Sequence, residues 1–181
     1  MKKNFFVKGL VVFLICAVCC VNANAQNTFS QGDKVVNLGL GLASGWGHKD
    51  YKIAIPPLSG SFEYCIIDNL FNDKSSIGVG GYFGHVSYKD KHVSDWNYSY
   101  TIIGARAAFH YQLVDNLDTH AGVMAGYNLY SSSYKEIRGS SAPAFDVFLG
   151  ARYYFLNNLG AFAEVGWGGI AYLQLGLAVK F

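Results

Sequence analysis

The sequence lacks several features of helical membrane proteins and of disulfide-stabilised secreted domains. After residue 25 it has no run of eighteen apolar residues, which excludes a membrane-spanning helix from that part of the chain. Cys65 is the only cysteine after residue 25, so no disulfide can form within this part. Charged residues make up only 14% of the chain and there are three prolines, although 51% of the residues are hydrophobic. This composition is unusually apolar for a soluble protein.

Aromatic residues and glycine are abundant instead. The chain holds 13 tyrosines, 13 phenylalanines and 21 glycines. Aromatic residues favour strands, and glycine is common where one backbone approaches another closely. The composition therefore predicts an all-β protein.

The first 25 residues resemble a secretory leader. Three lysines lie in the first eight residues, an apolar stretch covers residues 9–21, and Ala23 and Ala25 form the small-x-small pattern of a cleavage site. We therefore expect a signal peptide over residues 1–25 and a single domain over residues 26–181. Without the leader, 11 basic residues face 12 acidic ones, giving a formal charge of −1 that does not favour nucleic acid as a partner.

Three similar short segments divide the rest of the chain. They read "IIDNLF" (66–71), "LVDNLD" (113–118) and "FLNNLG" (155–160). Asn and Asp tolerate left-handed backbone conformations, so each segment predicts a tight reversal between strands. Longer polar segments at 45–56, 88–98 and 131–144, and a very short one near 168–170, lie between these turns. The predicted strands are 35–44, 57–67, 76–87, 99–113, 119–130, 145–155, 160–167 and 171–181.

The strands alternate in a way that identifies two different faces. In residues 101–113, one parity is largely apolar and includes Ile103 and Phe109, whereas the other carries Arg106 and His110. The bulky aromatic side chains fall on the apolar parity of the other strands too, and the glycines and charges fall on the opposite one.

This distribution separates a membrane barrel from a soluble one. A soluble lipocalin-type barrel would also alternate, with its large apolar side chains inside. The interior of a small barrel is too narrow for the bulky parity, and the polar parity has too few charges for a surface in water. The apolar face must then meet lipid, where only a closed barrel satisfies the backbone of a strand. We therefore predict an eight-stranded antiparallel up-and-down transmembrane β-barrel in the outer membrane of a Gram-negative cell.

The last nine residues, "LQLGLAVKF", carry a recognisable pattern of Gln174, Gly176, Val179 and Phe181. This pattern resembles the C-terminal assembly signal of outer-membrane proteins. With the leader and the eight strands, the chain after residue 25 resembles the small outer membrane protein beta-barrel domain families, which include the transmembrane domain of outer-membrane protein A and the X-type barrels. The resemblance implies recognition by the barrel assembly machinery, short turns in the periplasm and long loops outside the cell.

Charged residues on the inward parity predict a polar network that fills the barrel. Its expected members are Glu63, Arg106, Asp146, Arg152 and Glu164. The third turn should place Arg152 opposite Phe162 and within reach of Glu164. An interior filled in this way argues against a diffusion pore.

His110 and His120 are expected to face one another across the second turn. Two imidazoles can bind a transition metal, but no third ligand at a recognisable spacing accompanies them in the sequence. The sequence alone therefore favours ordinary hydrogen-bonded histidines and predicts no metal and no cofactor.

Enzymes that modify lipid A use the same kind of barrel, so catalysis needs separate consideration. His85 or His92 with Ser87, Ser94 or Asp95 supplies the residue types of a base and a nucleophile. No local motif fixes these residues relative to one another. We therefore expect a non-enzymatic barrel that serves envelope integrity or surface interactions through its loops, in contact with lipid, lipopolysaccharide or an unknown surface protein. A lipid A acyltransferase or deacylase is the first alternative, and an adhesin is the second.

Overall fold

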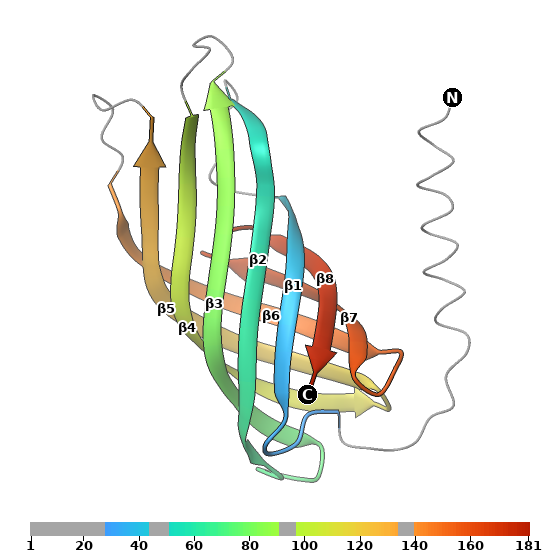
Figure 1. Ribbon diagram of the computed structural model, residues 1–181. Coiled ribbons are helices and arrows are strands. Elements are labelled where there is room, and N and C mark those ends of the chain that lie inside the picture. The colour runs from blue at the N-terminus through green and yellow to red at the C-terminus, as the bar shows by residue number, and fades with distance from the viewer. Residues whose placement is uncertain (1–27, 44–50, 91–96, 134–139) are drawn as a thin grey trace, which may run out of the picture.

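The computed structural model describes residues 28–43, 51–90, 97–133 and 140–181. Within these ranges eight strands form one closed antiparallel barrel in which each strand pairs with its neighbours in the chain and β1 closes against β8 (Figure 1). The strands are β1 (Lys34–Ala43), β2 (Tyr51–Asp68), β3 (Ser75–Asp90), β4 (Asn97–Val114), β5 (Leu117–Ser132), β6 (Ala142–Tyr154), β7 (Leu159–Trp167) and β8 (Leu173–Lys180). The predicted eight-stranded up-and-down barrel is confirmed. The predicted leader, with Ala23 and Ala25, lies outside the described residues.

Two of the three predicted turns have an asparagine in the left-handed conformation. Asn69 and Asn116 adopt positive φ angles of 53° and 62°. Residues 115–116 alone join β4 to β5, a tight reversal as predicted, whereas residues 69–74 form a longer connection between β2 and β3. The third turn produces the predicted register, in which Arg152 lies opposite Phe162.

β2 extends well beyond its predicted start, because it begins at Tyr51 rather than residue 57. β3 ends at Asp90 and β4 begins at Asn97, so both continue two or three residues into the predicted loop at 88–98. Pro56 ended the predicted loop, but Pro56 and Pro57 lie at an irregularity in the ladder with β3, between Ile55 and Leu58, and beyond the last recorded pair with β1. Proline is tolerated in a strand at such a bulge because no ladder hydrogen bond is lost there.

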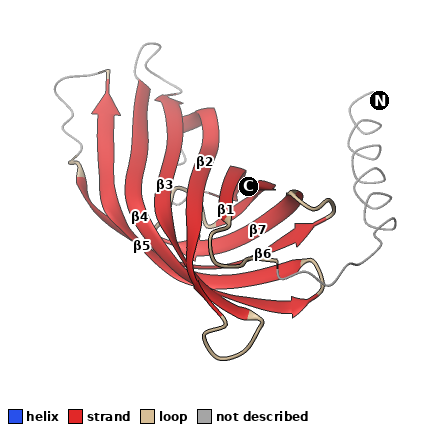
Figure 2. Ribbon diagram, turned by 60° about the horizontal axis from the view of Figure 1, so that its bottom comes forward, coloured by secondary structure: helices blue, strands red, loops and turns tan. Residues whose placement is uncertain are grey.

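The barrel is consequently uneven in height. β2 to β5 have 16 to 18 residues, whereas β7 and β8 have nine and eight. Figure 2 shows the far ends of β2 to β5 standing clear of β6 and β7. We call residues 51–56 of β2 and the neighbouring ends of β3 to β5, at residues 87–90, 97–99 and 131–132, the projecting sheet.

The two faces of the strands are oriented as the alternation predicts. Phe62, Ile103 and Val147 are 43%, 53% and 66% exposed on the outside of the barrel. Arg106 and Glu164 are 4% and 3% exposed inside it. This orientation is the opposite of a soluble lipocalin-type barrel, whose large apolar side chains line the cavity.

Aromatic side chains on the outer face gather near both ends of the strands. Phe83, Tyr127, Phe145 and Trp167 are exposed toward the long-loop end, and Tyr64 and Phe181 are exposed toward the short-turn end. Such belts mark the two interfaces of a membrane-spanning barrel. Among the described residues, no helix is long and apolar enough to cross a bilayer.

The interior is filled in three layers along the barrel. The projecting sheet and upper barrel hold an apolar and aromatic cluster that includes Tyr88, Tyr98 and Ile102. The middle layer holds most of the buried charged residues, and the short-turn end holds a smaller cluster that includes Phe29 and Tyr154. The candidate site lies in the middle layer, between two apolar layers.

Candidate functional site

Two arginines connect the walls of the barrel across its interior. Arg106 on β4 places Nε 2.9 Å from Oε1 of Glu63 on β2, and its Nη2 donates to Oε2 of Glu164 on β7 at 2.7 Å. Arg152 on β6 also pairs with Glu63, and its Nη1 donates to Oδ2 of Asp118 on β5 at 3.1 Å. Each of these side chains is at most 4% exposed. The ion pairs therefore join strands from opposite sides of the barrel.

The guanidinium groups have further partners in the same layer. Nε of Arg152 donates to Oδ1 of Asn37 on β1 at 3.1 Å, and Asn37 donates in turn to Ser61. The guanidinium of Arg106 lies over the ring of Phe148 at 3.9 Å from its centroid. A cation over an aromatic face is attracted most strongly when both groups are buried, and Arg106 and Phe148 are 4% and 3% exposed.

Four of the five residues predicted for the interior network come together in this layer, namely Glu63, Arg106, Arg152 and Glu164. Asp146 is buried separately, toward the long-loop end, where the backbone amides of Trp167 and Gly169 hydrogen-bond to it. The guanidinium of Arg152 reaches Glu63 and Asp118, whereas the predicted partner Glu164 is bound by Arg106. The ladder register fixed the position of Arg152 correctly, but partners across the interior depend on how the barrel closes.

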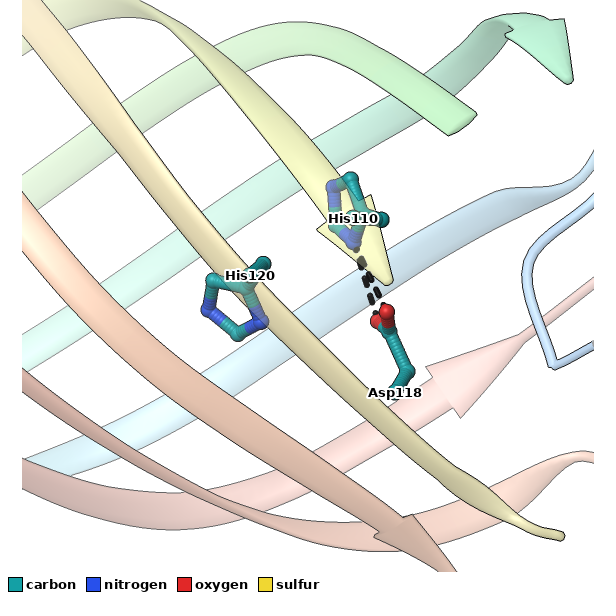
Figure 3. Close-up of side chains that lie close together, drawn as sticks. All are labelled: His110, Asp118 and His120. Carbon is teal, nitrogen blue, oxygen red and sulfur yellow. Dashed lines mark hydrogen bonds and ion pairs between the residues drawn. The ribbon is translucent and has the colours of Figure 1, made fainter. Parts of the chain in front are cut away.

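His110 and His120 lie directly opposite one another on β4 and β5, with ring centroids 5.3 Å apart. Asp118 lies beside them, 3.0 Å from Nδ1 of His110 through both carboxylate oxygens (Figure 3). Nε2 of His120 is 3.2 Å from Oε2 of Glu164. All three of His110, Asp118 and His120 are buried, and one ligand atom from each lies within 4.8 Å of the others.

Asp118 is the residue that the sequence did not identify. Asp118 is the last residue of the segment "LVDNLD", which the sequence assigned to a turn. In the structure β5 already begins at Leu117, and the carboxylate of Asp118 lies inside the barrel. The spacing Asp118-x-His120 could have found it, because residues two apart in a strand share a face.

The N-terminal described residues close the short-turn end of the barrel. Phe29 lies over His110 with ring centroids 4.4 Å apart, and the amide of Thr28 donates to Oε1 of Gln112 at 2.9 Å. Both Thr28 and Phe29 are buried. Thr28 and Phe29 therefore separate the charged layer from the short-turn end of the barrel.

The residues of the predicted assembly signal lie on β8 and at its end. Gln174 is buried and accepts a 3.4 Å hydrogen bond from the hydroxyl of Tyr82, while Val179 and Phe181 lie on the outer face. The backbones of Phe181 and Lys34 exchange two hydrogen bonds, which joins this end to β1.

Gly176 has a structural role that is independent of any recognition by a receptor. A Cβ at this position would lie 2.0 Å from the backbone oxygen of Leu38 and 2.7 Å from Phe162. We expect Gly176→Ala to lower the free energy of unfolding by about 1–3 kcal/mol. It should therefore lower the refolding yield in detergent without assembly proteins. Gly60→Ala is the matched control, because its added Cβ would make only ordinary contacts, with Leu38 at 3.7 Å and with the backbone oxygen of Asn37 at 4.0 Å. Equal yields for both variants would show that Gly176 is not required for packing.

The residues considered for catalysis are not assembled into a base and nucleophile in the described part of the chain. Nδ1 of His85 is 2.9 Å from Oγ1 of Thr101, and the hydroxyl of Ser87 donates to the carbonyl of Tyr98 at 3.4 Å. His92, Ser94 and Asp95 lie outside the described residues.

Comparison with known proteins gives structural but no sequence relatives. No protein-family model and no curated protein matches the sequence. The crystal structure of Ail, the attachment invasion locus protein of Yersinia pestis, matches with 13% identity and a TM-score of 0.51, over 83% of this chain and 99% of that one. Ail in complex with the heparin analogue sucrose octasulfate matches with 11% identity and a TM-score of 0.52, over the same shares of the two chains. The chain therefore has the fold of the small eight-stranded outer-membrane barrels, as its sequence indicated.

Proposed function

We propose that this protein is a non-enzymatic integral outer-membrane barrel that acts at the cell surface through its projecting sheet. Its localisation would follow from cleavage of the leader after Ala25 and from assembly by the barrel assembly machinery. Its outer face would contact membrane lipid, and its long-loop end would contact lipopolysaccharide. Envelope integrity and surface interactions are the two roles open to such a barrel, and the uneven height of the strands favours surface interactions.

The interior supports a role other than transport. Ion pairs join β2 to β4 and β6, and β4 to β7, through side chains that are almost fully buried. An eight-stranded barrel has room only for its own side chains. We therefore expect no stable conductance when the purified protein is inserted into a planar lipid bilayer.

The free edge of β2 carries the proposal. Tyr51, Lys52, Ile53 and Ile55 pair with β3 on one side, and among the described residues of β1 none pairs with β2 beyond Leu58. Ile53 and Ile55 are 60% and 41% exposed in this stretch. An unpaired strand edge offers backbone donors and acceptors to an extended segment of another protein, which adds to the sheet as a further strand.

Position-specific photo-crosslinking on intact cells tests this role. A photoreactive phenylalanine analogue at Ile53 is expected to form an adduct with a protein, and the Ile55→Lys substitution in the same chain should reduce that adduct at least fivefold. The same analogue at Phe71, which is exposed at the opposite end of the barrel, is the control. Adducts with lipid alone at position 53, or identical protein adducts at both positions, would contradict a role for the β2 edge.

The enzymatic alternative requires a different measurement. Mass spectrometry of lipid A from cells with and without the protein should show the same acyl pattern. A change in acyl chains that depends on the protein would overturn the non-enzymatic assignment.

A further inference from the structure

We propose that His110, Asp118 and His120 form a binding site for one divalent transition-metal ion of the zinc and copper class inside the barrel. Two imidazoles and a carboxylate are a donor set that suits these ions, whereas magnesium and calcium prefer oxygen ligands alone. The inference concerns the interior of the barrel and does not depend on the function proposed for the projecting sheet.

The three residues are placed by the ladder between β4 and β5. His110 and His120 are direct partners in this ladder, and Asp118 lies two residues before His120 on the same inward face. The ligand atoms lie within 4.8 Å of one another. Bonds of about 2.0–2.2 Å to such an ion put opposite ligands up to about 4.4 Å apart, so little movement is needed to close the set.

Each imidazole has one buried nitrogen without a hydrogen-bond partner, namely Nε2 of His110 and Nδ1 of His120. A buried polar atom without a partner is costly, and such an atom in a native protein calls for a specific explanation. A bound metal ion would explain both nitrogens, one by direct binding and the other through the tautomer of its ring. Nδ1 of His120 would bind the ion directly, because its Nε2 already faces Glu164 at 3.2 Å.

The explanation for His110 involves a change of tautomer. Nδ1 of His110 now faces both oxygens of Asp118 at 3.0 Å. When Nδ1 and Asp118 bind the ion together, the ring proton resides on Nε2, which faces Oε2 of Glu63 at 3.7 Å. Both rings would then bind the ion through Nδ1 and direct Nε2–H toward a glutamate. Metal-binding histidines in proteins are almost always oriented by such an outer partner.

The buried charges also favour a dication. The layer around the site holds the carboxylates of Glu63, Asp118 and Glu164 and the guanidinium groups of Arg106 and Arg152. Three negative and two positive groups leave a surplus of one negative charge in this layer when both histidines are neutral. Uncompensated buried charge is strongly unfavourable, and two adjacent imidazolium rings would repel each other. One divalent ion between neutral imidazoles would supply positive charge beside Asp118 without that repulsion.

Zinc binding by the whole refolded barrel tests the proposal. Phe29 covers His110, so zinc is supplied during refolding into detergent micelles and the excess is removed by dialysis. We expect one zinc ion per folded chain by elemental analysis, with folding verified by heat-modifiable migration in gels. His110→Gln and His120→Gln should each weaken zinc binding at least tenfold in competition with a chromophoric chelator.

His85→Gln is the matched control, because His85 lies outside the interior cluster and bonds to Thr101. It should leave zinc binding unchanged. A folded chain that retains no zinc, or equal binding by the His85→Gln and His120→Gln variants, would overturn the proposal. If the interior variants do not fold, the unaltered chain is refolded with Cu²⁺ instead. Its electron paramagnetic resonance spectrum should show coupling of the copper to two nitrogens. A spectrum without nitrogen coupling would overturn the proposal.

Discussion

Replacing Arg152 by Leu is expected to destabilise the folded barrel by about 3–5 kcal/mol, the largest effect of any single change in the charged layer. Arg152 is fully buried and pairs with Glu63 and Asp118, and its Nε donates to Asn37. Leu fills part of the space, but the buried carboxylates of Glu63 and Asp118 each lose the arginine as a partner. The loss is measured as the change in free energy of unfolding by urea after refolding into lipid vesicles.

Two further variants separate charge from packing at this position. Arg152→Leu combined with Asp118→Asn should recover part of the lost stability, because the second change removes a carboxylate that the first one leaves without its arginine. Lys52→Ala, at an exposed position in β2, should change stability by less than about 0.5 kcal/mol. If Arg152→Leu were as mild as Lys52→Ala, the ion pairs would not hold the barrel walls together.

An arginine on the lipid-facing side should have the second-largest effect. Leu149 is exposed on β6 between Phe145 and Tyr153, at the middle of the outer face. Leu149→Arg is expected to cost about 2–4 kcal/mol in a bilayer, since a charge at the midplane loses its hydration.

Depth provides the control for this prediction. Phe145 lies nearer the long-loop end, in the aromatic belt. Phe145→Arg should lower the free energy of unfolding by only about 0–1 kcal/mol, because the charge can reach the interface. Both free energies come from the same unfolding experiment in vesicles. Equal costs at the two positions would show that the outer face does not cross hydrocarbon.

The sequence was sufficient for those parts of the fold that depend on neighbouring residues. Alternation in residues 101–113 placed Ile103 outside and Arg106 inside, because side chains in a strand alternate between its two faces. The register of Arg152 opposite Phe162 followed from a short turn, whose length fixes the pairing of the strands that it joins.

The remaining features depend on contacts between residues far apart in the chain. The contact of Arg106 with Glu164 joins residues 58 positions apart across the interior, and strand alternation says nothing of that distance. Asp118 was missed because the segment "LVDNLD" resembles a turn whether or not its last residue already belongs to the following strand. Residues 51–56 of β2 were missed because Pro56 interrupts the pattern, and the irregularity in the ladder between Ile55 and Leu58 that accommodates it cannot be read from neighbouring residues.

The orientation of the two strand faces is tested most directly by fluorescence quenching from within the bilayer. Trp46, Trp96 and Trp167 are replaced by Phe, and a single tryptophan is introduced as Leu149→Trp or as Phe148→Trp, at adjacent positions on opposite faces of β6. In vesicles of brominated lipid, we predict strong quenching for the tryptophan at 149 and little for the one at 148. Strong quenching at 148 with none at 149 would mean that the bulky side chains line a cavity, which contradicts a membrane-spanning barrel.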